Sequence, residues 1–289
     1  MMDLSKPLVS IIIPCYNHGA YIQEAIDSIV VDKISYPIEI IIVDDGSTDI
    51  DTLSKLKALQ AAGYHVIFQK NGGPASARNT GVANAKGQYI LPLDADNKIS
   101  PDYINKAVPL LVKEDIDIVY ARPIFFGDLS QKKRQYKVRK FDDLDIVTGN
   151  CADACALYKR EVWEKNGGYD TDIPFYGFED WEFWINAASN GFKFHLLDEE
   201  LFYYRIINNS VITGYSNEDK IKLNKQYIIK KHSDFYLEKI IRLSYIKERY
   251  EVDMLRFIIT PILYPLYLLK IIDSPIVRSR KKFKEHKHN

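Results

Sequence analysis

The sequence predicts an α/β fold whose central sheet is mostly parallel and is flanked by helices. Two observations lead to this prediction. Short apolar runs rich in β-branched residues, each long enough for one strand, recur through the first hundred residues. Segments with helical periodicity or many small residues separate these runs. Such strand–helix–strand alternation is typical of right-handed βαβ units, in which helices cover a parallel sheet.

Four apolar runs in the first half are expected to form the parallel strands. They are residues 9–14, 38–43, 64–69 and 89–93. Their lengths and compositions suit buried strands.

Three helices are expected between these strands. The first has apolar side chains along one face, at Tyr21, Ile22, Ala25, Ile26, Ile29 and Val30. The second has its apolar residues at Ile50, Leu53, Leu56 and Leu59, and is expected to stop at Gly63. The third is expected to begin at Pro74 and to end at Gly87, and its many small residues would let it lie close to the sheet.

From about Asp117 the alternation gives way to a mixed region. Here we expect strands at 118–121, 192–197 and 201–205, helices at 159–165 and 179–190, and a charged helical stretch over 218–250. Residues 132–140 contain six basic side chains, and an acidic stretch follows them. A solvated hairpin is the favoured interpretation of this basic run, and a lipid or acceptor contact is the alternative.

Composition limits the classes of function. The 289 residues have a formal net charge of zero, and 27% are charged, as in ordinary globular proteins. Residues 278–289 are strongly basic, but the body of the chain is not, so a nucleic-acid partner is not expected. The three cysteines fit no zinc pattern and are expected to be buried in a reducing compartment. The N-terminal residues lack the basic region of a signal peptide.

The most informative motif is Asp94-Ala95-Asp96, which directly follows the run at 89–93. A strand ending there places both acids at the carboxyl edge of the sheet, where open α/β folds bind ligands. Hard divalent ions take a few carboxylate oxygens and complete their coordination with water and phosphate. The pair therefore indicates a metal that carries a diphosphate. The alternative is a strand end followed by a helix cap.

Three further loops are expected at the same edge, because all parallel strands point the same way. They are residues 14–17, 44–47 and 71–74. With Asp94 and Asp96 they offer an aromatic ring for a base, carboxylates for ribose hydroxyls and a metal, and a glycine-rich helix entry. This combination predicts a nucleotide-diphosphate pocket. The dinucleotide fingerprint and the phosphate-binding P-loop motif are both missing from this sequence.

Four motifs in fixed order give a more specific resemblance. They are residues 9–17, 42–49, 72–81 and 93–96. Together they resemble family 2 inverting glycosyltransferases with a GT-A fold, over roughly residues 8–205. The resemblance implies a Rossmann-like GT-A domain at 1–215, with a nucleotide-sugar half at about 1–117 and an acceptor half at about 118–215. A helical extension with an apolar segment and a basic tail would follow at 216–289.

The resemblance also implies a donor site. Its nucleotide-sugar-binding residues would be Pro14, Tyr16, Asn17, Asp44, Asp45, Gly73, Arg78, Asp94, Ala95 and Asp96. Asp94 and Asp96 would hold Mg²⁺ or Mn²⁺, with Asp96 as the more direct ligand. Alternatives stay open for three of these residues: Tyr16 as a core residue, Arg78 as part of a surface ion pair, and Asp44 as a turn cap.

On the acceptor side, Glu179-Asp180 resembles a family motif whose aspartate is the general base, which makes Asp180 the catalytic candidate. Gly168, Glu179 and Trp181 would line the acceptor or sugar. Neighbouring aromatic residues would strip water from Asp180 and raise its pKa, whereas a helix N-terminus would lower it. A simple helix cap is the alternative.

One departure from the family pattern concerns a histidine that many relatives carry just after Tyr203-Tyr204-Arg205. Here the segment reads Ile206-Ile207-Asn208, so Asn208 or water would have to replace the imidazole. His195 lies too far upstream for this role and is expected within a strand. His18 is expected only to help start the first helix.

The resulting expectation is a metal-dependent hexosyltransferase that moves a sugar from a UDP-sugar to a saccharide or lipid-linked acceptor, with inversion, in polysaccharide synthesis. The alternatives are a sugar nucleotidyltransferase and a non-catalytic subunit of a polysaccharide assembly. Residues 257–269 are apolar but too short and proline-broken to span a bilayer, so they would either attach to a membrane surface or pack on the body. The expected location is the cytoplasm, at the inner face of the cell membrane.

Overall fold

The structure is a computed structural model that describes residues 6–113, 115–130, 136, 138–207, 218–246 and 249. The chain divides into two compact units, Met1–Ser233 and Asp234–Asn289, each described by itself. The predicted division into 1–215 and 216–289 stays a prediction. Every residue of the candidate site lies in the first unit.

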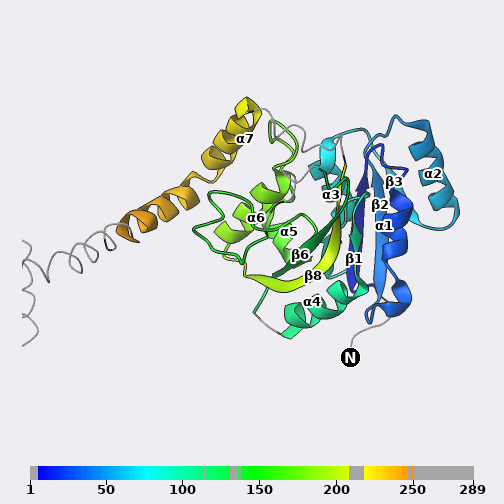
Figure 1. Ribbon diagram of the computed structural model, residues 1–289, viewed down its shortest axis with the longest axis horizontal. Coiled ribbons are helices and arrows are strands. Elements are labelled where there is room, and N and C mark those ends of the chain that lie inside the picture. Colours follow the sequence, from blue (N-terminus) through cyan, green and yellow to red (C-terminus); the bar gives the residue numbers. More distant parts are fainter. Residues whose placement is uncertain are drawn as a thin grey trace, which may run out of the picture. The chain divides into compact units, whose positions relative to one another are not determined.

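The first unit contains an eight-stranded sheet with helices on its faces (Figure 1). The strand order is β3-β2-β1-β4-β7-β6-β8-β5. The strands are β1 Val9–Cys15, β2 Ile38–Asp44, β3 His65–Phe68, β4 Tyr89–Pro92, β5 Lys98–Ile99, β6 Ile118–Gly127, β7 Leu157–Lys159 and β8 Phe194–Ile206. Strands β1 to β4 pair in parallel, which confirms the βαβ prediction.

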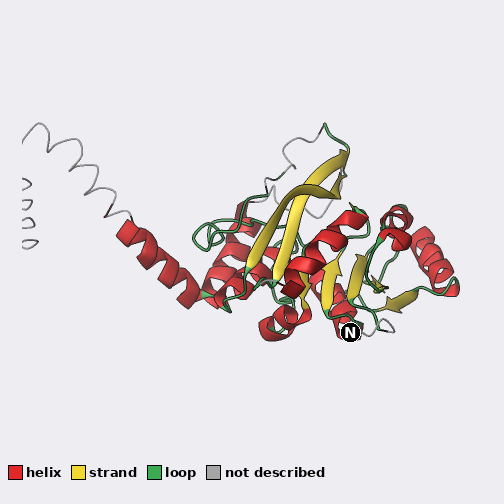
Figure 2. Cartoon of the chain, turned by 90° about the horizontal axis from the view of Figure 1, so that it is seen from below, coloured by secondary structure: helices red, strands yellow, loops and turns green. Residues whose placement is uncertain are grey.

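The helices lie on both sides of the strands (Figure 2). They are α1 Ile22–Ser28, α2 Ile50–Ala61, α3 Gly73–Asn84, α4 Pro101–Lys113, α5 Arg160–Asn166, α6 Glu179–Ser189 and α7 Glu218–Lys231, with a short 3₁₀ turn η1 at Val31–Lys33. Of these, α4 was not among the predicted helices.

Helix α3 packs closely on the sheet, as its small residues predict. A Cβ atom on Gly81 would lie only 2.2 Å from Cγ2 of Ile12 on β1. The helix ends at Asn84, so the predicted stop at Gly87 is wrong. Gly87 instead lies against β1, where an added Cβ would be 2.5 Å from Oγ of Ser10.

Helix α2 corrects one residue of the predicted apolar face. Asp49 caps this helix by accepting a hydrogen bond of 2.8 Å from the Thr52 amide. Leu56 and Leu59 are buried, as expected. Ile50 is 80% exposed, because it occupies the first helical position and points away from the sheet. Helix α1 ends at Ser28, so Val30, which was expected on its apolar face, lies beyond the helix and is exposed.

The second half of the sheet is mixed rather than parallel. Strand β7 pairs antiparallel with β4 and β6, whereas β6 and β8 run parallel through register shifts near Arg122. The two strands predicted at 192–197 and 201–205 form one continuous strand, β8. Its exposed acidic residues Asp198 and Glu199 lie at a register shift and pair with Arg122 and Lys106, while the pairing with β6 continues on both sides of them.

The core lies between the sheet and its helices and includes fully buried residues of β1, β4 and α4. Tyr103 of α4 donates hydrogen bonds from its buried hydroxyl to the carbonyls of Val119 and Cys155. All three cysteines are buried and free, as predicted.

In the second unit, residues 234–246 are helical. The predicted apolar segment at 257–269 and the basic tail at 278–289 lie outside the described residues, as does most of the basic run at 132–140. In the part of the chain that the structure describes, every helix is too short or too polar to cross a membrane.

Candidate active site

The first predicted loops meet through Asn17 at the carboxyl edge of the sheet. Asn17 adopts a left-handed conformation with φ of 55°. Its side-chain oxygen accepts hydrogen bonds from the amides of Thr48 (2.8 Å) and Asp49 (3.0 Å). Its own amide donates to Oγ of Ser47 over 2.9 Å. The loop after β1 is thus fixed to the loop after β2.

Asp45 links the loop after β2 to the start of α3. Its Oδ1 accepts hydrogen bonds from the Gly72 amide (2.8 Å) and the Gln69 side chain (2.7 Å), and its Oδ2 accepts one from the Gly73 amide (2.8 Å). Gly73 has φ of 84°, and a Cβ there would lie 2.4 Å from the ring of Tyr176. Asp45 therefore orders the glycine-rich helix entry, besides its predicted contact with the nucleotide.

Three other residues that are predicted to bind the nucleotide sugar differ in their environments. Tyr16 is 45% exposed, which excludes the core alternative. Asp44 accepts a hydrogen bond from the Ser47 amide, as the turn-cap alternative requires. Pro14 lies in β1 beside Val43.

Arg78 joins the two halves of the site. Its Nη2 lies 2.8 Å from Oδ1 of Asp94, and its Nη1 lies 3.0 Å from Oε1 of Glu179. The residue is only 4% exposed, so it is not part of a surface ion pair. Burial alone would lower the pKa of Arg78, but the charges of Asp94 and Glu179 raise it well above its ordinary value. A permanent positive charge thus bridges the donor and acceptor motifs.

Glu179 is committed to internal contacts. Besides pairing with Arg78, it accepts a hydrogen bond of 2.7 Å from the Gly177 amide through Oε2. Trp181 is 4% exposed, and its indole N–H donates to the Ile146 carbonyl over 2.7 Å. Gly168 has φ of 88°, and an added Cβ would lie 2.8 Å from Oδ1 of Asn79. These three predicted acceptor-side residues are therefore packed against other parts of the protein. Their contact with a ligand stays a prediction.

Asp94 and Asp96 form the predicted carboxylate pair after β4, and Ala95 between them is buried. Loss of hydration, followed by the nearby charge of Asp94, raises the pKa of Asp96 to about 7. Two neighbouring carboxylates that repel each other suit a hard divalent cation. Among the described residues there is no cluster of three or more metal-ligating side chains. A divalent ion held by this pair would take its remaining ligands from phosphate and water.

Arg205 of β8 holds this acidic loop in place. Its Nε donates to the carbonyl of Asp96 over 2.9 Å, and its backbone amide donates to the side-chain oxygen of Asn97 over 2.8 Å. Its guanidinium also pairs with Glu24 at 2.8 Å and lies over the ring of Tyr21. The end of β8 therefore positions the predicted metal pair.

Two histidines, His195 and His18, lie where the sequence predicts. His195 lies within β8, and the His18 carbonyl accepts the first hydrogen bonds of α1, as expected for both. Burial lowers the pKa of His18, and the charge of Asp94 opposes this shift. Asn208, the candidate replacement for the family histidine, lies outside the described residues.

Asp180, the predicted base, lies in the first turn of α6. Its Oδ2 accepts a hydrogen bond of 2.8 Å from the Asn150 side chain, and its Oδ1 accepts one of 2.7 Å from the Trp181 amide. Loss of hydration, then the charges of Glu179 and Asp153, raise the pKa of Asp180 to about 8. The direction agrees with the prediction, and a pKa in this range suits a general base.

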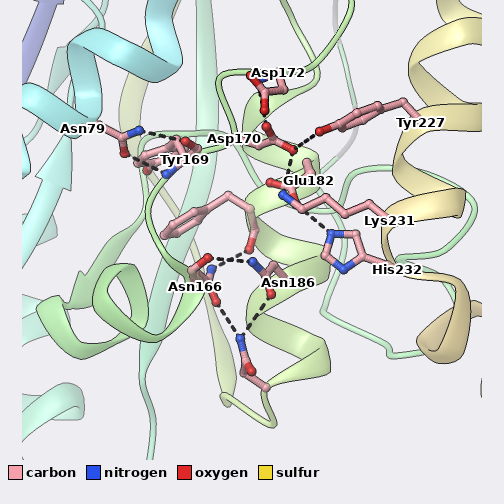
Figure 3. A network of polar contacts seen from close by, with 12 residues as sticks. Asn79, Asn166, Tyr169, Asp170, Asp172, Glu182, Asn186, Tyr227, Lys231 and His232 are labelled. Carbon is pink, nitrogen blue, oxygen red and sulfur yellow. Dashed lines mark hydrogen bonds and ion pairs between the residues drawn. The ribbon is translucent and has the colours of Figure 1, made fainter.

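A polar network fixes helix α6 from the side of α7 (Figure 3). Glu182, which is fully buried, accepts from Lys231 over 2.8 Å and lies 2.7 Å from Nε2 of His232. Lys231 also pairs with Asp170 at 2.7 Å, and the Tyr227 hydroxyl donates to the same carboxylate over 2.9 Å. These contacts anchor the helix that carries Asp180.

Two residues of the site were missed from the sequence. Asn150 and Asp153 both belong to the segment before β7, where Asp153 is an acid among small apolar residues. That unusual placement is the signal that could have identified it. Loss of hydration and the charge of Asp94 raise the pKa of Asp153 to about 6.

The charges of four acidic residues all act on the phenol of Tyr204. Burial raises the pKa of this phenol most, and the charges of Asp153, Asp94, Asp96 and Asp180 raise it further. These carboxylates come from three separate segments of the sequence, at 94–96, 153 and 180. The predicted metal pair and the predicted base thus share one site.

A sheet of this topology, with carboxylates at the carboxyl ends of its parallel strands, is typical of α/β proteins that bind nucleotides. The profile of Glycosyl transferase family 2 matches residues 10–167, and the chain belongs to that family. It is therefore a glycosyltransferase.

Curated relatives agree with this assignment. The uncharacterized glycosyltransferase EpsJ of Bacillus subtilis is 33% identical over 239 residues, which are 76% of this chain and 68% of that protein. Chondroitin synthase of Pasteurella multocida is 28% identical over 77% of this chain and 23% of its own length.

Solved structures confirm the GT-A fold. Residues 1–349 of Staphylococcus aureus TarS, in complex with UDP-GlcNAc, match with a TM-score of 0.59 at 21% identity, over 74% of this chain and 64% of that one. The mannosyltransferase PcManGT from Pyrobaculum calidifontis, in complex with GDP-Man and Mn²⁺, matches with a TM-score of 0.53 at 22% identity, over 72% and 60%. The chain thus spans less than two thirds of either solved protein.

Proposed function

We propose that the protein is a metal-dependent, inverting glycosyltransferase that uses a UDP-sugar as donor and a saccharide or lipid-linked saccharide as acceptor. The observation that carries this proposal is the buried Arg78, which pairs with Asp94 of the predicted metal pair and with Glu179, the residue before the predicted base Asp180. The charges of Asp94, Asp96 and Asp180 also all act on Tyr204.

The loops after β1 and β2 would bind the nucleotide, with Tyr16 exposed for stacking on the base. Asp94 and Asp96 would hold Mg²⁺ or Mn²⁺, which supplies positive charge to the departing diphosphate. The solved PcManGT complex contains Mn²⁺ and the TarS complex contains UDP-GlcNAc, and both support this choice of ligands.

The transfer would be a single displacement with Asp180 as base. Asp180 takes the proton of the acceptor hydroxyl while that oxygen bonds to the anomeric carbon from the face opposite the leaving group. The bond between the anomeric carbon and the diphosphate oxygen breaks in the same step, and the configuration inverts. The raised pKa of Asp180, about 8, gives it the proton affinity that this role needs.

The relatives support polysaccharide synthesis as the setting. They include chondroitin synthase and hyaluronan synthase of Pasteurella multocida and a putative teichuronic acid biosynthesis glycosyltransferase of Bacillus subtilis. We extend the proposal to action at the inner face of the cell membrane, on the basis of the apolar segment 257–269 and the basic tail.

Thermal unfolding with UDP-glucose, UDP-galactose, UDP-GlcNAc, UDP-GalNAc and GDP-mannose, with and without Mn²⁺, tests the proposal. A donor is expected to raise the Tm only when Mn²⁺ is present, and to be hydrolysed slowly to its nucleoside diphosphate. Asp96→Ala should lose the metal-dependent rise. A protein that forms a sugar nucleotide from a sugar phosphate and a nucleotide would instead be a nucleotidyltransferase. Binding of a donor without any hydrolysis or transfer would indicate a non-catalytic subunit.

A further inference from the structure

The carboxylate of Asp153 has no part in the reaction described above, yet it lies inside the site. Its Oδ1 accepts a hydrogen bond of 2.9 Å from the Cys155 amide, and its Oδ2 accepts one of 2.7 Å from the Tyr136 hydroxyl. An ionised carboxylate can accept about four hydrogen bonds. Asp153 is half-buried rather than sealed in the core, so acceptor capacity remains for a ligand.

Asp153 belongs to the segment that contacts the proposed base through Asn150, and it interacts electrostatically with the proposed metal pair. The charge of Asp94 raises the pKa of Asp153, and the charge of Asp153 in turn raises the pKa values of Asp96 and Asp180. Asn150, three residues earlier on the same segment, donates directly to Asp180 over 2.8 Å. The segment before β7 therefore connects the two chemical ends of the site.

An aromatic wall holds this carboxylate in one orientation. The Tyr136 ring packs edge-on against Tyr204 at 5.3 Å and against Phe125 at 5.4 Å between ring centroids. The hydroxyl of Tyr136 then fixes Oδ2 of Asp153. A side chain locked in this way is preorganised to accept hydrogen bonds from a ligand.

Among the described residues, no lysine, arginine or histidine forms an ion pair with Asp153. Arg78 stabilises its charge only from a distance. An acid that is placed beside other acids without a salt-bridge partner costs folding stability. Binding of a ligand with several hydroxyl groups would explain why the protein keeps a carboxylate at this position.

We propose that Asp153 binds the transferred sugar and accepts hydrogen bonds from its ring hydroxyls. This inference rests on the function proposed above. In a single displacement the sugar lies between the leaving diphosphate, near Asp94, and the acceptor hydroxyl, near Asp180. The segment of Asp153 contacts Asp180 through Asn150, and its partner Tyr136 packs against Tyr204. These contacts place the carboxylate beside the sugar, where neighbouring hydroxyls can donate to both of its oxygens.

Asp153→Asn is the informative variant because it preserves the internal contacts. The amide oxygen can still accept from the Cys155 amide, and the amide nitrogen can donate to the Tyr136 hydroxyl, which also acts as an acceptor. Tyr136→Phe is the matched control, since it removes the supporting hydrogen bond and keeps the carboxylate. Binding of UDP reports that each variant is folded.

The measurement is the ratio of two dissociation constants in the presence of Mn²⁺. One is for the UDP-sugar that gives the largest Tm rise in the panel above, and the other is for UDP. Loss of hydrogen bonds to a charged acceptor should raise this ratio about 10- to 100-fold in Asp153→Asn. Tyr136→Phe keeps the charged acceptor and loses only its support, so its ratio should rise less, by about threefold at most. The ratio also cancels any change in diphosphate binding caused by the lost charge.

Deoxy donors provide a second test, which compares the wild type with Asp153→Asn one hydroxyl at a time. Removing one ring hydroxyl from the donor should weaken binding to the wild type about tenfold or more, and should have little effect on Asp153→Asn. An unchanged ratio in Asp153→Asn, or equal sensitivity of both proteins to every deoxy donor, overturns the role of Asp153 alone. A wild type that binds neither UDP nor any donor with Mn²⁺ overturns the proposed function itself, and this inference with it.

Discussion

The proposed donor side and the proposed acceptor side of the site are built differently. On the donor side, backbone amides hold the key polar groups: Asp45 is bound by Gly72 and Gly73, and Asn17 by Thr48 and Asp49. On the acceptor side, side chains hold one another, as Glu182 does with Lys231 and His232. Backbone contacts depend on short motifs, whereas side-chain pairs depend on residues far apart in the sequence. The donor side should therefore resist substitution of distant residues, and the acceptor side should not.

The largest effect is expected from Asp180→Asn on the acceptor side. Without a base, the acceptor hydroxyl keeps its proton, so kcat should fall by a factor of about 10³ or more. Donor binding should change little, because the nucleotide contacts lie on the other side. Transfer assays and donor titrations on the same preparation measure both quantities. Near-normal transfer by this variant would contradict the assignment.

Arg78→Met breaks the link between the two sides. The variant leaves Asp94 and Glu179 without their buried partner, and the free energy of unfolding should fall by about 3–5 kcal/mol. Urea unfolding measures this loss. The control is Arg122→Met, which removes the exposed pair with Asp198 and should cost about 0–1 kcal/mol. Equal losses in the two variants would mean that Arg78 does not couple the halves.

Asp96→Ala tests the proposed donor side through its metal-dependent binding of UDP. Loss of one metal-binding carboxylate should weaken Mn²⁺-dependent binding of UDP about 10- to 100-fold. Binding without metal should stay the same or improve, since a repelling charge is removed. Isothermal titration with and without Mn²⁺ gives both values. The interpretation fails if the metal dependence of the variant equals that of the wild type.

The pH dependence of transfer should follow Asp180. Its pKa of about 8 means that the base is increasingly deprotonated as the pH rises, so kcat/KM should increase and level off above about pH 8. Glu179→Gln removes a charge that raises this pKa, so the rise should move to lower pH. A profile that is flat from pH 6 to 9, measured at saturating Mn²⁺, argues against this base.

The smallest expected effect concerns stability without metal. The raised pKa of Asp96, about 7, means that the folded protein keeps a proton that the unfolded chain loses near pH 4. Stability should therefore fall as the pH rises from about 4 to 8. Asp96→Asn should remove part of this fall and raise the Tm of the metal-free protein at pH 8 by about 2–4 °C. A Tm for Asp96→Asn below that of the wild type at pH 8 would have the wrong sign.

The contrast between backbone contacts and side-chain pairs explains which parts of the fold and of the site could be predicted from the sequence. The four donor loops follow strands of clear pattern, so their meeting at one edge follows from a parallel sheet. The pairing of Arg78 with Glu179 joins residues 101 positions apart, and local spacing carries no trace of it. The sequence predicts two strands where β8 is one, since the polar residues 198–200 interrupt the apolar pattern, and only the pairing with β6 on both sides of them reveals one strand.

The central claim is that a metal-bound nucleotide sugar lies beside Asp94 and Asp96 and opposite Asp180. The most direct measurement is the anomalous scattering of Mn²⁺ in crystals of the protein grown with UDP. The account predicts a peak between the Asp94 and Asp96 carboxylates that also contacts the diphosphate, with Asp180 facing the β-phosphate across the cleft. A peak bound by other residues, or a nucleotide seated away from the carboxyl ends of β1, β2 and β4, would contradict it.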